Sequence, residues 1–278
     1  MSLRLMYITN NPDVALIAEK NGVDRVWIDL ETLGKEERQK GMNTVKSNHK
    51  ISDIAVLSKV LTKSELLVRT NPWNENSVEE IEKVISAGAN RIMLPMWKSL
   101  SEVDCFLRTI NKRVSTTLLL ETKEAVECLD EVLLHPLLDE IHIGLNDLHL
   151  SYGLTFLFEP LSSGMVEKLC KKMKDAGVSF GFGGIAKIGE GMLPAERVVM
   201  EHYRLGSTRA ILSRSFCNAE EITDLAEVEE VFSKNMKLLR EYEKNIVNFS
   251  DSDFEQNKIK VASDVASIVS KIKGSKNA

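Results

Sequence analysis

The sequence contains no long apolar run, few cysteines and few aromatic residues. It has 278 residues, of which 4 are cysteines, and aromatic residues make up 6% of the chain. The cysteines show no Cys-x-x-Cys spacing, so we interpret them as reduced thiols rather than zinc ligands or disulfide partners: Cys105, Cys128, Cys170 and Cys217. No stretch approaches the roughly 20 apolar residues of a membrane span. The apolar stretch within residues 1–10 is too short, and ends too soon, for a secretory signal. These absences predict a cytoplasmic protein without a membrane partner.

The chain also lacks an excess of basic residues. It carries 36 Lys and Arg against 41 Asp and Glu, which gives a formal net charge of -5. Nucleic acids and anionic membranes both attract a basic face, so this balance argues against either as the main partner. Its hydrophobic content of 43% and charged content of 28% are ordinary for a globular enzyme.

Short apolar runs alternate with amphipathic stretches along most of the chain. The runs are strand candidates, because strands buried on both faces of a sheet read as continuous apolar segments. They are Leu3–Thr9, Arg25–Leu30, Glu65–Thr70, Arg91–Met96, Thr116–Glu121, Glu140–Leu145, Val178–Gly183 and Thr208–Ser213. This alternation predicts an α/β fold, a (β/α)8 barrel of about 250 residues, with an open doubly wound sheet as the alternative.

Helices are expected between and after these runs, over Lys123–Leu134, Gly164–Asp175, Ala219–Tyr242 and Asp253–Lys273. We expect residues 1–245 to form the barrel and residues 246–278 to form a C-terminal helical extension. Leu33–Asn48 is polar and basic, and we interpret it as a long loop on the catalytic face.

Two carboxylates follow apolar runs at neighbouring strands. Glu121 ends the fifth run and Asp147 comes shortly after the sixth. In a parallel barrel, the C-terminal ends of the strands form the catalytic face. Two carboxylates there suit Mg²⁺ or Mn²⁺, with water and substrate as further ligands. The alternative is that each carboxylate caps the helix that follows it.

Other charged residues lie at the same predicted face. Arg69 ends the third run, where a guanidinium can pair with a carboxylate and polarise a carbonyl, or else form a structural ion pair. Of the acidic pair Asp29 and Glu31, we favour Glu31 for a site role; the alternative is a salt bridge to Lys35, Arg38 or Arg69. His149 lies close enough to Asp147 to act as an acid–base group. His49 belongs to the polar loop that can fold over the pocket, and His142 alternates with apolar residues as a barrel-layer or a helix-facing residue would.

Glycines and polar residues follow the seventh and eighth runs. Gly183 and Gly184 lie in the segment Gly181–Ala186, and Ser213 and Arg214 end the eighth run. Phosphate sites in such barrels use these loops, through backbone N–H groups and side chains. Tight packing would explain the glycines equally well.

Five segments follow one another with a characteristic spacing: Ile28–Glu31, Val68–Arg69, Ala87–Ala89 with Leu94–Met96, Leu120–Ala125, and Ile143–Leu148. They resemble the HpcH/HpaI aldolase and citrate lyase β-subunit superfamily from about residue 5 to residue 216. The resemblance implies a phosphoenolpyruvate/pyruvate-type barrel with a divalent metal on Glu121 and Asp147. It also implies that Arg69 contacts the pyruvyl oxygens, that the backbone of Gly144, Leu145 and Asn146 holds the substrate carboxylate, and that the chain forms a homo-oligomer by exchange of its C-terminal helix.

The sequence departs from the hydroxy-oxo-acid aldolases of this superfamily at two positions. Thr32 stands where they place a histidine as base, and Leu119 stands where a polar residue is common. The acidic pair Asp29 and Glu31 is closer to the pattern of the citrate-lyase branch.

The main hypothesis is a metal-dependent carbon–carbon lyase, an aldolase that joins pyruvate and an aldehyde into a 2-oxo acid or cleaves that acid. An acidic or phosphorylated sugar aldehyde would suit Arg214 and the glycines. The alternatives are an acyl-CoA thioester lyase similar to citrate lyase and a non-catalytic barrel that binds an oxo-acid.

Overall fold

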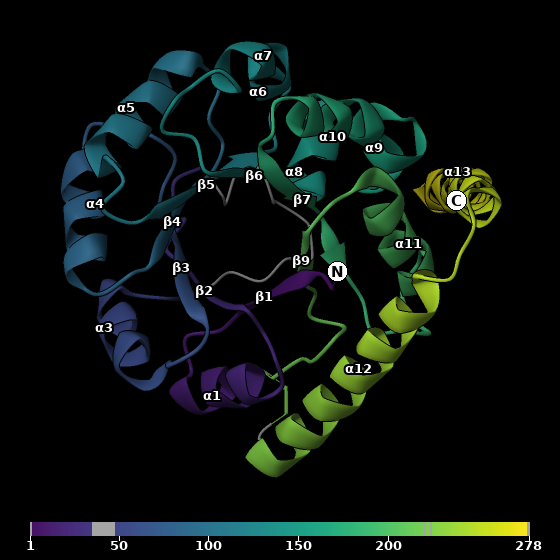
Figure 1. The fold of residues 1–278 in the computed structure, drawn as a ribbon, viewed down its shortest axis with the longest axis horizontal. Helices are drawn as coiled ribbons and strands as arrows, with labels where there is room; N and C mark the ends of the chain where they lie inside the picture. Colours follow the sequence, from purple (N-terminus) through teal and green to yellow (C-terminus); the bar gives the residue numbers. More distant parts are fainter. Residues whose placement is uncertain (1, 35–47, 220, 223, 277–278) are drawn as a thin grey trace.

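Parallel strands form a ring surrounded by helices in the computed structural model, which describes residues 2–34, 48–219, 221–222 and 224–276 (Figure 1). The order of the strands around the ring is β7-β6-β5-β4-β3-β2-β1-β9-β8, and every pairing is parallel. The strands are β1 (Arg4–Ile8), β2 (Arg25–Asp29), β3 (Glu65–Arg69), β4 (Arg91–Leu94), β5 (Ser115–Leu120), β6 (Glu140–Ile143), β7 (Ser179–Phe182), β8 (Gly184–Ile185) and β9 (Arg209–Leu212).

The ring closes at Gly183, which separates β7 from β8. Its N–H donates to the carbonyl of Ile143 in β6 at 2.8 Å, and its carbonyl accepts from the N–H of Ile211 in β9 at 3.4 Å. Gly183 has φ +52°, a conformation that residues with a side chain rarely adopt, and a Cβ there would lie 2.7 Å from Leu145 Cδ1, so a substitution would be strained. β7 and β8 therefore act as one strand with a bend. This confirms the predicted (β/α)8 barrel, whereas the expectation that Gly184 and Ile185 form a loop was wrong.

The helices are α1 (Pro12–Lys20), α3 (Ile51–Val60), α4 (Ser77–Ser86), α5 (Leu100–Ile110), α6 (Lys123–Glu127), α7 (Leu129–Val132), α8 (Leu145–Ser151), α9 (Glu159–Ser162), α10 (Met165–Asp175), α11 (Ala195–Leu205), α12 (Leu225–Ile246) and α13 (Asp251–Lys276). The predicted helix over Lys123–Leu134 is broken at Cys128, whose φ of -98° and ψ of 9° end α6. The helix expected from Ala219 begins only at Leu225, after Asp224 caps it by accepting from the N–H of Ala226. Most of the predicted loop Leu33–Asn48 lies outside the described residues.

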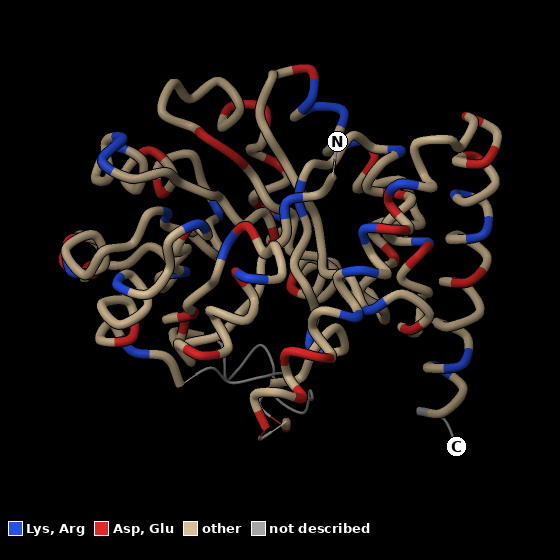
Figure 2. The backbone as a smooth tube through the Cα atoms, turned by 60° about the horizontal axis from the view of Figure 1, so that its bottom comes forward, with Lys and Arg blue, Asp and Glu red and all other residues tan. Residues whose placement is uncertain are grey.

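The C-terminal helices lie outside the ring. α12 packs against α1 and α11, and α13 packs against α9 and α11 of the same chain (Figure 1). Acidic and basic residues are mixed along α13 (Figure 2). Within the described ranges, no helix is both long and apolar enough to cross a membrane.

The interior of the ring is built in layers, because side chains two residues apart on a strand point to the same side. The middle layer is apolar: Met6, Trp27, Leu67, Met93 and Leu119 pack together. Two residues further along three of these strands lie Asp29, Arg69 and Glu121, toward the C-terminal ends. The apolar layer thus lies directly beneath the charged side chains of Asp29, Arg69 and Glu121.

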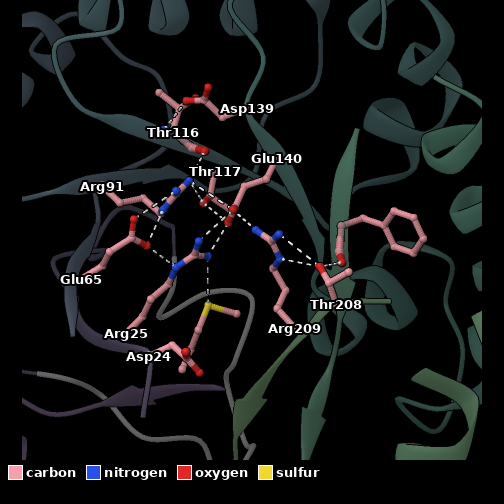
Figure 3. Close-up of polar contacts among 12 residues, drawn as sticks. Asp24, Arg25, Glu65, Arg91, Thr116, Thr117, Asp139, Glu140, Thr208 and Arg209 are labelled. Atoms are coloured by element: carbon pink, nitrogen blue, oxygen red, sulfur yellow. Dashed lines mark hydrogen bonds and ion pairs between the residues drawn. The ribbon is translucent and has the colours of Figure 1, made fainter. Parts of the chain in front are cut away.

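Two residues earlier on the strands, a second charged layer forms the N-terminal floor of the barrel (Figure 3). Arg25 donates from Nη1 and Nη2 to the two carboxylate oxygens of Glu140 at 2.6 and 3.0 Å. Glu65 accepts from Arg25 Nε at 2.5 Å and from Arg91 Nε at 3.2 Å. We call Arg25, Glu65, Arg91, Glu140 and Arg209 the floor cluster; it joins the starts of five strands.

Candidate active site

Arg69 is held at the end of β3 by the neighbouring strand β2. Asp29 and Arg69 are register partners, and Arg69 donates from Nε and Nη2 to the two carboxylate oxygens of Asp29 at 2.9 and 2.8 Å. Its guanidinium also lies over Trp27, 5.0 Å from the ring centroid. The neighbouring carboxylates of Asp29 and Glu31 raise the pKa of Arg69 despite its burial. The arrangement fixes a permanent positive charge in one orientation.

Glu31 lies beside the same guanidinium. Its Oε2 is 3.3 Å from Arg69 Nη2, and its side chain is only 2% exposed. The Glu31 N–H donates to Asp29 Oδ1 at 3.2 Å, so the turn after β2 is tied to the strand end. The structure therefore brings the predicted site residue Glu31 together with Arg69.

Glu121, directly after β5, is a buried carboxylate, 2% exposed. Its Oε1 accepts from the N–H of Met96 at 3.1 Å. Burial and the negative charges of Asp147 and Glu31 raise the pKa of Glu121 well above its usual value, although Arg69 opposes them. The site thus keeps a carboxylate where its charge is poorly compensated.

The backbone around Glu121 is shaped to fit it. Met96 has φ +53°, an unusual value for a residue with a side chain, and this turn directs its N–H to Glu121. On the opposite side, a Cβ at Gly144 would lie 2.6 Å from Glu121 Oε2 and 3.0 Å from Glu121 Cβ. Glycine at position 144 therefore leaves the space that the carboxylate occupies.

The short helix α8 carries Asp147 and His149. Both are buried, with relative exposures of 9% and 5%. The N–H groups of Leu145, Asn146 and Asp147 form the first turn after Gly144, where a helix lacks internal acceptors. His149 Nδ1 lies 3.3 Å from the carbonyl of Leu145, one turn back in its own helix. Asp147 thus joins Glu121 electrostatically, whereas the recorded contact of His149 is within α8.

The donor set fits a divalent cation. Asp29, Glu31, Glu121 and Asp147 bring four carboxylates to one end of the barrel, and the cation that lowers the pKa of Glu121 is Arg69. Within the described ranges no three Asp, Glu, His or Cys side chains form a metal-ligand group. Glu121 and Asp147 lie close enough for the charge of Asp147 to raise the pKa of Glu121, and Mg²⁺ commonly keeps several waters beside one or two carboxylate ligands.

The predicted phosphate-binding residues lie on the other side of the ring. The Gly183 N–H is engaged by Ile143, so this group serves ring closure. Ser213 Oγ lies 2.9 Å from Ser215 Oγ, and Arg214 is exposed. A role of Gly184, Ser213 and Arg214 in substrate binding stays a prediction.

A cavity of about 450 Å³ opens beside Asp147 on the catalytic face. Its lining comes from the segments that follow β4, β5 and β6: Met96, Lys98, Thr122, Glu124, Asp147, Leu150 and Ser151. A small organic molecule that contacts Asp147 would therefore have room to extend away from the barrel axis.

Two further residues lie at the end of β2: Asp29, whose salt bridge to Arg69 was the alternative to a site role, and His49. Asp29 makes the bidentate pair with Arg69, and its place two residues after Trp27 is the signal that could have placed it in the interior. His49 Nδ1 accepts from the N–H of Asp29 at 3.0 Å, so this histidine does lie at the end of β2. His142 is a barrel-layer residue, as expected, since a Cβ at the interior position Gly181 would lie 3.0 Å from its Nδ1.

A family model described as HpcH/HpaI aldolase/citrate lyase matches residues 4–157, more than half of the chain. The chain belongs to this family. A search of curated protein sequences found no match to this chain.

Solved structures share the fold of this HpcH/HpaI family chain at low sequence identity. An HpcH/HpaI aldolase from Desulfitobacterium hafniense DCB-2 is 17% identical, with a TM-score of 0.57 over 86% of this chain and 93% of that one. The citrate lyase β subunit from M. tuberculosis, complexed with oxaloacetate and magnesium, is 14% identical, with a TM-score of 0.56 over 83% and 97%. The citrate synthase SbnG is 16% identical, with a TM-score of 0.57 over 87% and 95%.

At Thr32 and Leu119, where the resemblance led us to expect a histidine and a polar residue, the structure shows local contacts. Thr32 donates from its N–H and its hydroxyl to Asn71 Oδ1 at 2.9 and 3.2 Å, so it ties the turn after β2 to the segment after β3. Leu119 belongs to the apolar layer directly beneath Glu121. Thr32 thus helps to fix the turn that carries Glu31, and Leu119 packs beneath Glu121.

Proposed function

We propose that the chain is a divalent-metal-dependent carbon–carbon lyase that forms or cleaves a 2-oxo acid from pyruvate and an aldehyde. The observation that carries the proposal is a fixed guanidinium, Arg69, at the same end of the barrel as the buried carboxylate of Glu121, whose pKa is raised by burial and by the charge of Asp147. Membership of an aldolase and citrate lyase family supports it, as does a structural relative whose complex contains oxaloacetate and magnesium.

Glu121 and Asp147 would hold the cation, which when bound supplies Lewis-acid stabilisation of negative charge on the keto oxygen. Arg69 uses Nε and Nη2 on Asp29, so Nη1 is left to bind the pyruvyl oxygens. The Arg69 side chain is 12% exposed, so it is not fully enclosed by the protein. Because Asp29 holds it in place, Arg69 needs no reorganisation as charge develops.

A proton must be removed from the pyruvate methyl group, or returned to it, in this chemistry. Glu31 is the first candidate, because its carboxylate lies beside the guanidinium that would orient the substrate. His149 is the second, and it must exchange its contact within α8 to reach the substrate. Of the segment Gly144 to Asn146, the N–H groups of Leu145 and Asn146 would bind the substrate carboxylate, because the Gly144 N–H donates to the carbonyl of Leu120 at 2.9 Å.

The predicted homo-oligomer, the exchange of residues 246–278 between subunits and the cytoplasmic location stay predictions. In the structure α13 packs on its own chain, against α9 and α11. Light scattering on the full chain and on a chain that ends at residue 245 tests the first two.

Solvent-deuterium exchange into the methyl group of pyruvate, followed by NMR, tests the proposal without knowledge of the aldehyde. We expect exchange that requires Mg²⁺ or Mn²⁺ and that is lost in Glu121→Gln and Asp147→Asn. The matched control is Glu127→Gln, an exposed glutamate on α6 that pairs with Lys123 at 3.9 Å, and it should keep the exchange. Calorimetric titration with Mn²⁺ should show one site that both site variants lose.

Two results would contradict the proposal. Exchange that survives in Glu121→Gln would place the cation elsewhere. Binding of Mn²⁺ without exchange, with or without an added aldehyde, would favour the thioester lyase or the oxo-acid-binding barrel, and a CoA-binding assay separates these two.

A further inference from the structure

The floor cluster lies at the N-terminal end of the barrel, opposite the candidate active site, and it contains more cations than anions. Three guanidiniums, those of Arg25, Arg91 and Arg209, share the carboxylates of Glu65 and Glu140 (Figure 3). The three arginine side chains are 8% exposed or less, whereas that of Glu65 is 36% exposed. A surplus of buried positive charge is unfavourable unless a counter-ion compensates it.

Arg209 is the least well satisfied member. Glu140 already accepts from Arg25 and from Thr117, and Arg91 Nη1 lies 3.2 Å from its Oε2. Arg209 Nη1 contacts the same oxygen but lacks the geometry of a hydrogen bond. Its Nε and Nη2 share a single acceptor, Thr208 Oγ1, at 3.2 and 3.1 Å.

A fourth arginine lies directly beside it. Arg4 in β1 and Arg209 in β9 are register partners in adjacent parallel strands, so their side chains start on the same side of the sheet. Arg4 is exposed, and within the described residues its guanidinium has no hydrogen bond or ion pair. The charges of Arg25, Arg91 and Arg4, together with burial, lower the pKa of Arg209 to about 9.

The other charged groups at this end are already engaged. Asp24 Oδ2 accepts from the N–H of Leu5 at 2.8 Å. Asp139 pairs with Lys112 at 2.6 Å and accepts from the N–H and the hydroxyl of Thr116. Glu65 is shared by Arg25 and Arg91. Neither Asp24 nor Asp139 has a recorded contact with Arg4 or Arg209 within the described residues.

We propose that Arg4 and Arg209 form a clamp for a phosphate-class oxyanion at the N-terminal mouth of the barrel. Two guanidiniums side by side match the several oxygens of such an anion, because each can donate two parallel N–H bonds. Arg4 reaches it from solvent and Arg209 from the barrel interior. The bound anion compensates the surplus charge of the floor cluster and so stabilises the starts of β1 and β9.

Thermal unfolding of the full chain, in Tris buffer with NaCl adjusted to constant ionic strength, tests the clamp. Inorganic phosphate should raise Tm in a saturable way, by roughly 5 °C at about 100 times its Kd. Arg4→Gln should lose this response and have a Tm in phosphate-free buffer at least equal to that of wild type, because it removes one of two adjacent like charges. Arg4→Glu should go further, with a higher basal Tm and no response, because it places a carboxylate beside Arg209. Arg4 is exposed, so neither variant should prevent folding.

The matched control is Arg108→Gln, which removes an exposed arginine paired with Asp104 on α5 and should respond as wild type does. A phosphate effect no larger than that of NaCl would overturn the proposal. So would an unchanged response in Arg4→Gln. Loss of the response in Arg214→Gln instead would place the anion at the opposite, catalytic end of the barrel. Calorimetry with phosphate should give one site per chain, absent in Arg4→Gln.

Discussion

Replacing Arg69 with methionine should destabilise the protein strongly as well as inactivate it. Asp29 is 2% exposed and accepts two hydrogen bonds from Arg69, at 2.9 and 2.8 Å. Methionine fills similar space but leaves this carboxylate without its cation. Breaking a buried pair from one side costs about 3–5 kcal/mol, because the remaining charge stays buried. For a domain of this size, such a loss lowers Tm by roughly 6–20 °C.

Urea unfolding of a double-mutant cycle separates the pair from the packing around it. Arg69→Met and Asp29→Asn should each be destabilising, and the double variant should lose less than the sum, because neither charge is then left alone. Arg108→Met is the surface control, since its side chain is 70% exposed and its pair with Asp104 should be worth at most about 1 kcal/mol. A loss below about 1 kcal/mol in Arg69→Met, or additive effects in the cycle, would show that Asp29 does not depend on Arg69.

Glu121→Gln should raise Tm in the absence of metal, because it removes a carboxylate whose pKa is raised by burial and by Asp147, and it should abolish the further rise caused by Mn²⁺; a lower metal-free Tm would contradict this. Gly144→Ala should reduce turnover on the order of 100-fold, because its Cβ would lie 2.6 Å from Glu121 Oε2 and displace it; unchanged steady-state kinetics would refute the steric argument. Burial lowers the pKa of His142 to about 4 and of His202 to about 3. The unfolded chain therefore binds more protons than the native protein below about pH 6.5, so stability falls with falling pH in that window, by about 1.4 kcal/mol per pH unit for each histidine. Urea midpoints measured from pH 7 to pH 5 should show this slope, and His142→Asn should reduce it.

The strands could be read from the sequence because each is buried on both faces and therefore continuously apolar. The same reasoning placed Arg69, Glu121 and Asp147 at one end of the barrel, since residues that follow parallel strands meet there. Glu31 was favoured over Asp29 in the sequence, yet Asp29 makes the bidentate pair and Glu31 a second contact at 3.3 Å. Asp29 and Glu31 follow Trp27 at steps of two, so the interior aromatic residue indicates the same side for both and does not distinguish them; Asp29 is the last residue of β2, whereas Glu31 lies in the turn after it.

Other features depend on distances that a sequence does not contain. The fit of Gly144 against Glu121 joins β5 to the start of α8, and its signal in the chain is a single glycine. The contact of His49 with the end of β2 follows a long polar segment whose path no periodicity reveals. The floor cluster is partly visible in the sequence, because each of its members is the first residue of a strand. A charged residue at the end of a strand is equally typical of an edge exposed to solvent, so the sequence does not indicate that these residues form a buried cluster.

The bend at Gly183 has a consequence for the order in which the molecule can fold. The proposed metal ligands, Arg69 and the donors for the substrate carboxylate all lie before residue 148, yet the ring closes only when β1 and β8 both pair with β9, near residue 210. A nascent chain that has just emerged through Asp147 therefore carries the chemical groups on an open sheet with two unpaired edges. Pairing β1 with a strand about 200 residues away is slow, because a long loop must close first. A substitution of Gly183 that disfavours its positive φ should therefore slow the closure of the barrel. This defect would be visible as a slow refolding phase, although no residue that contacts the substrate has been changed.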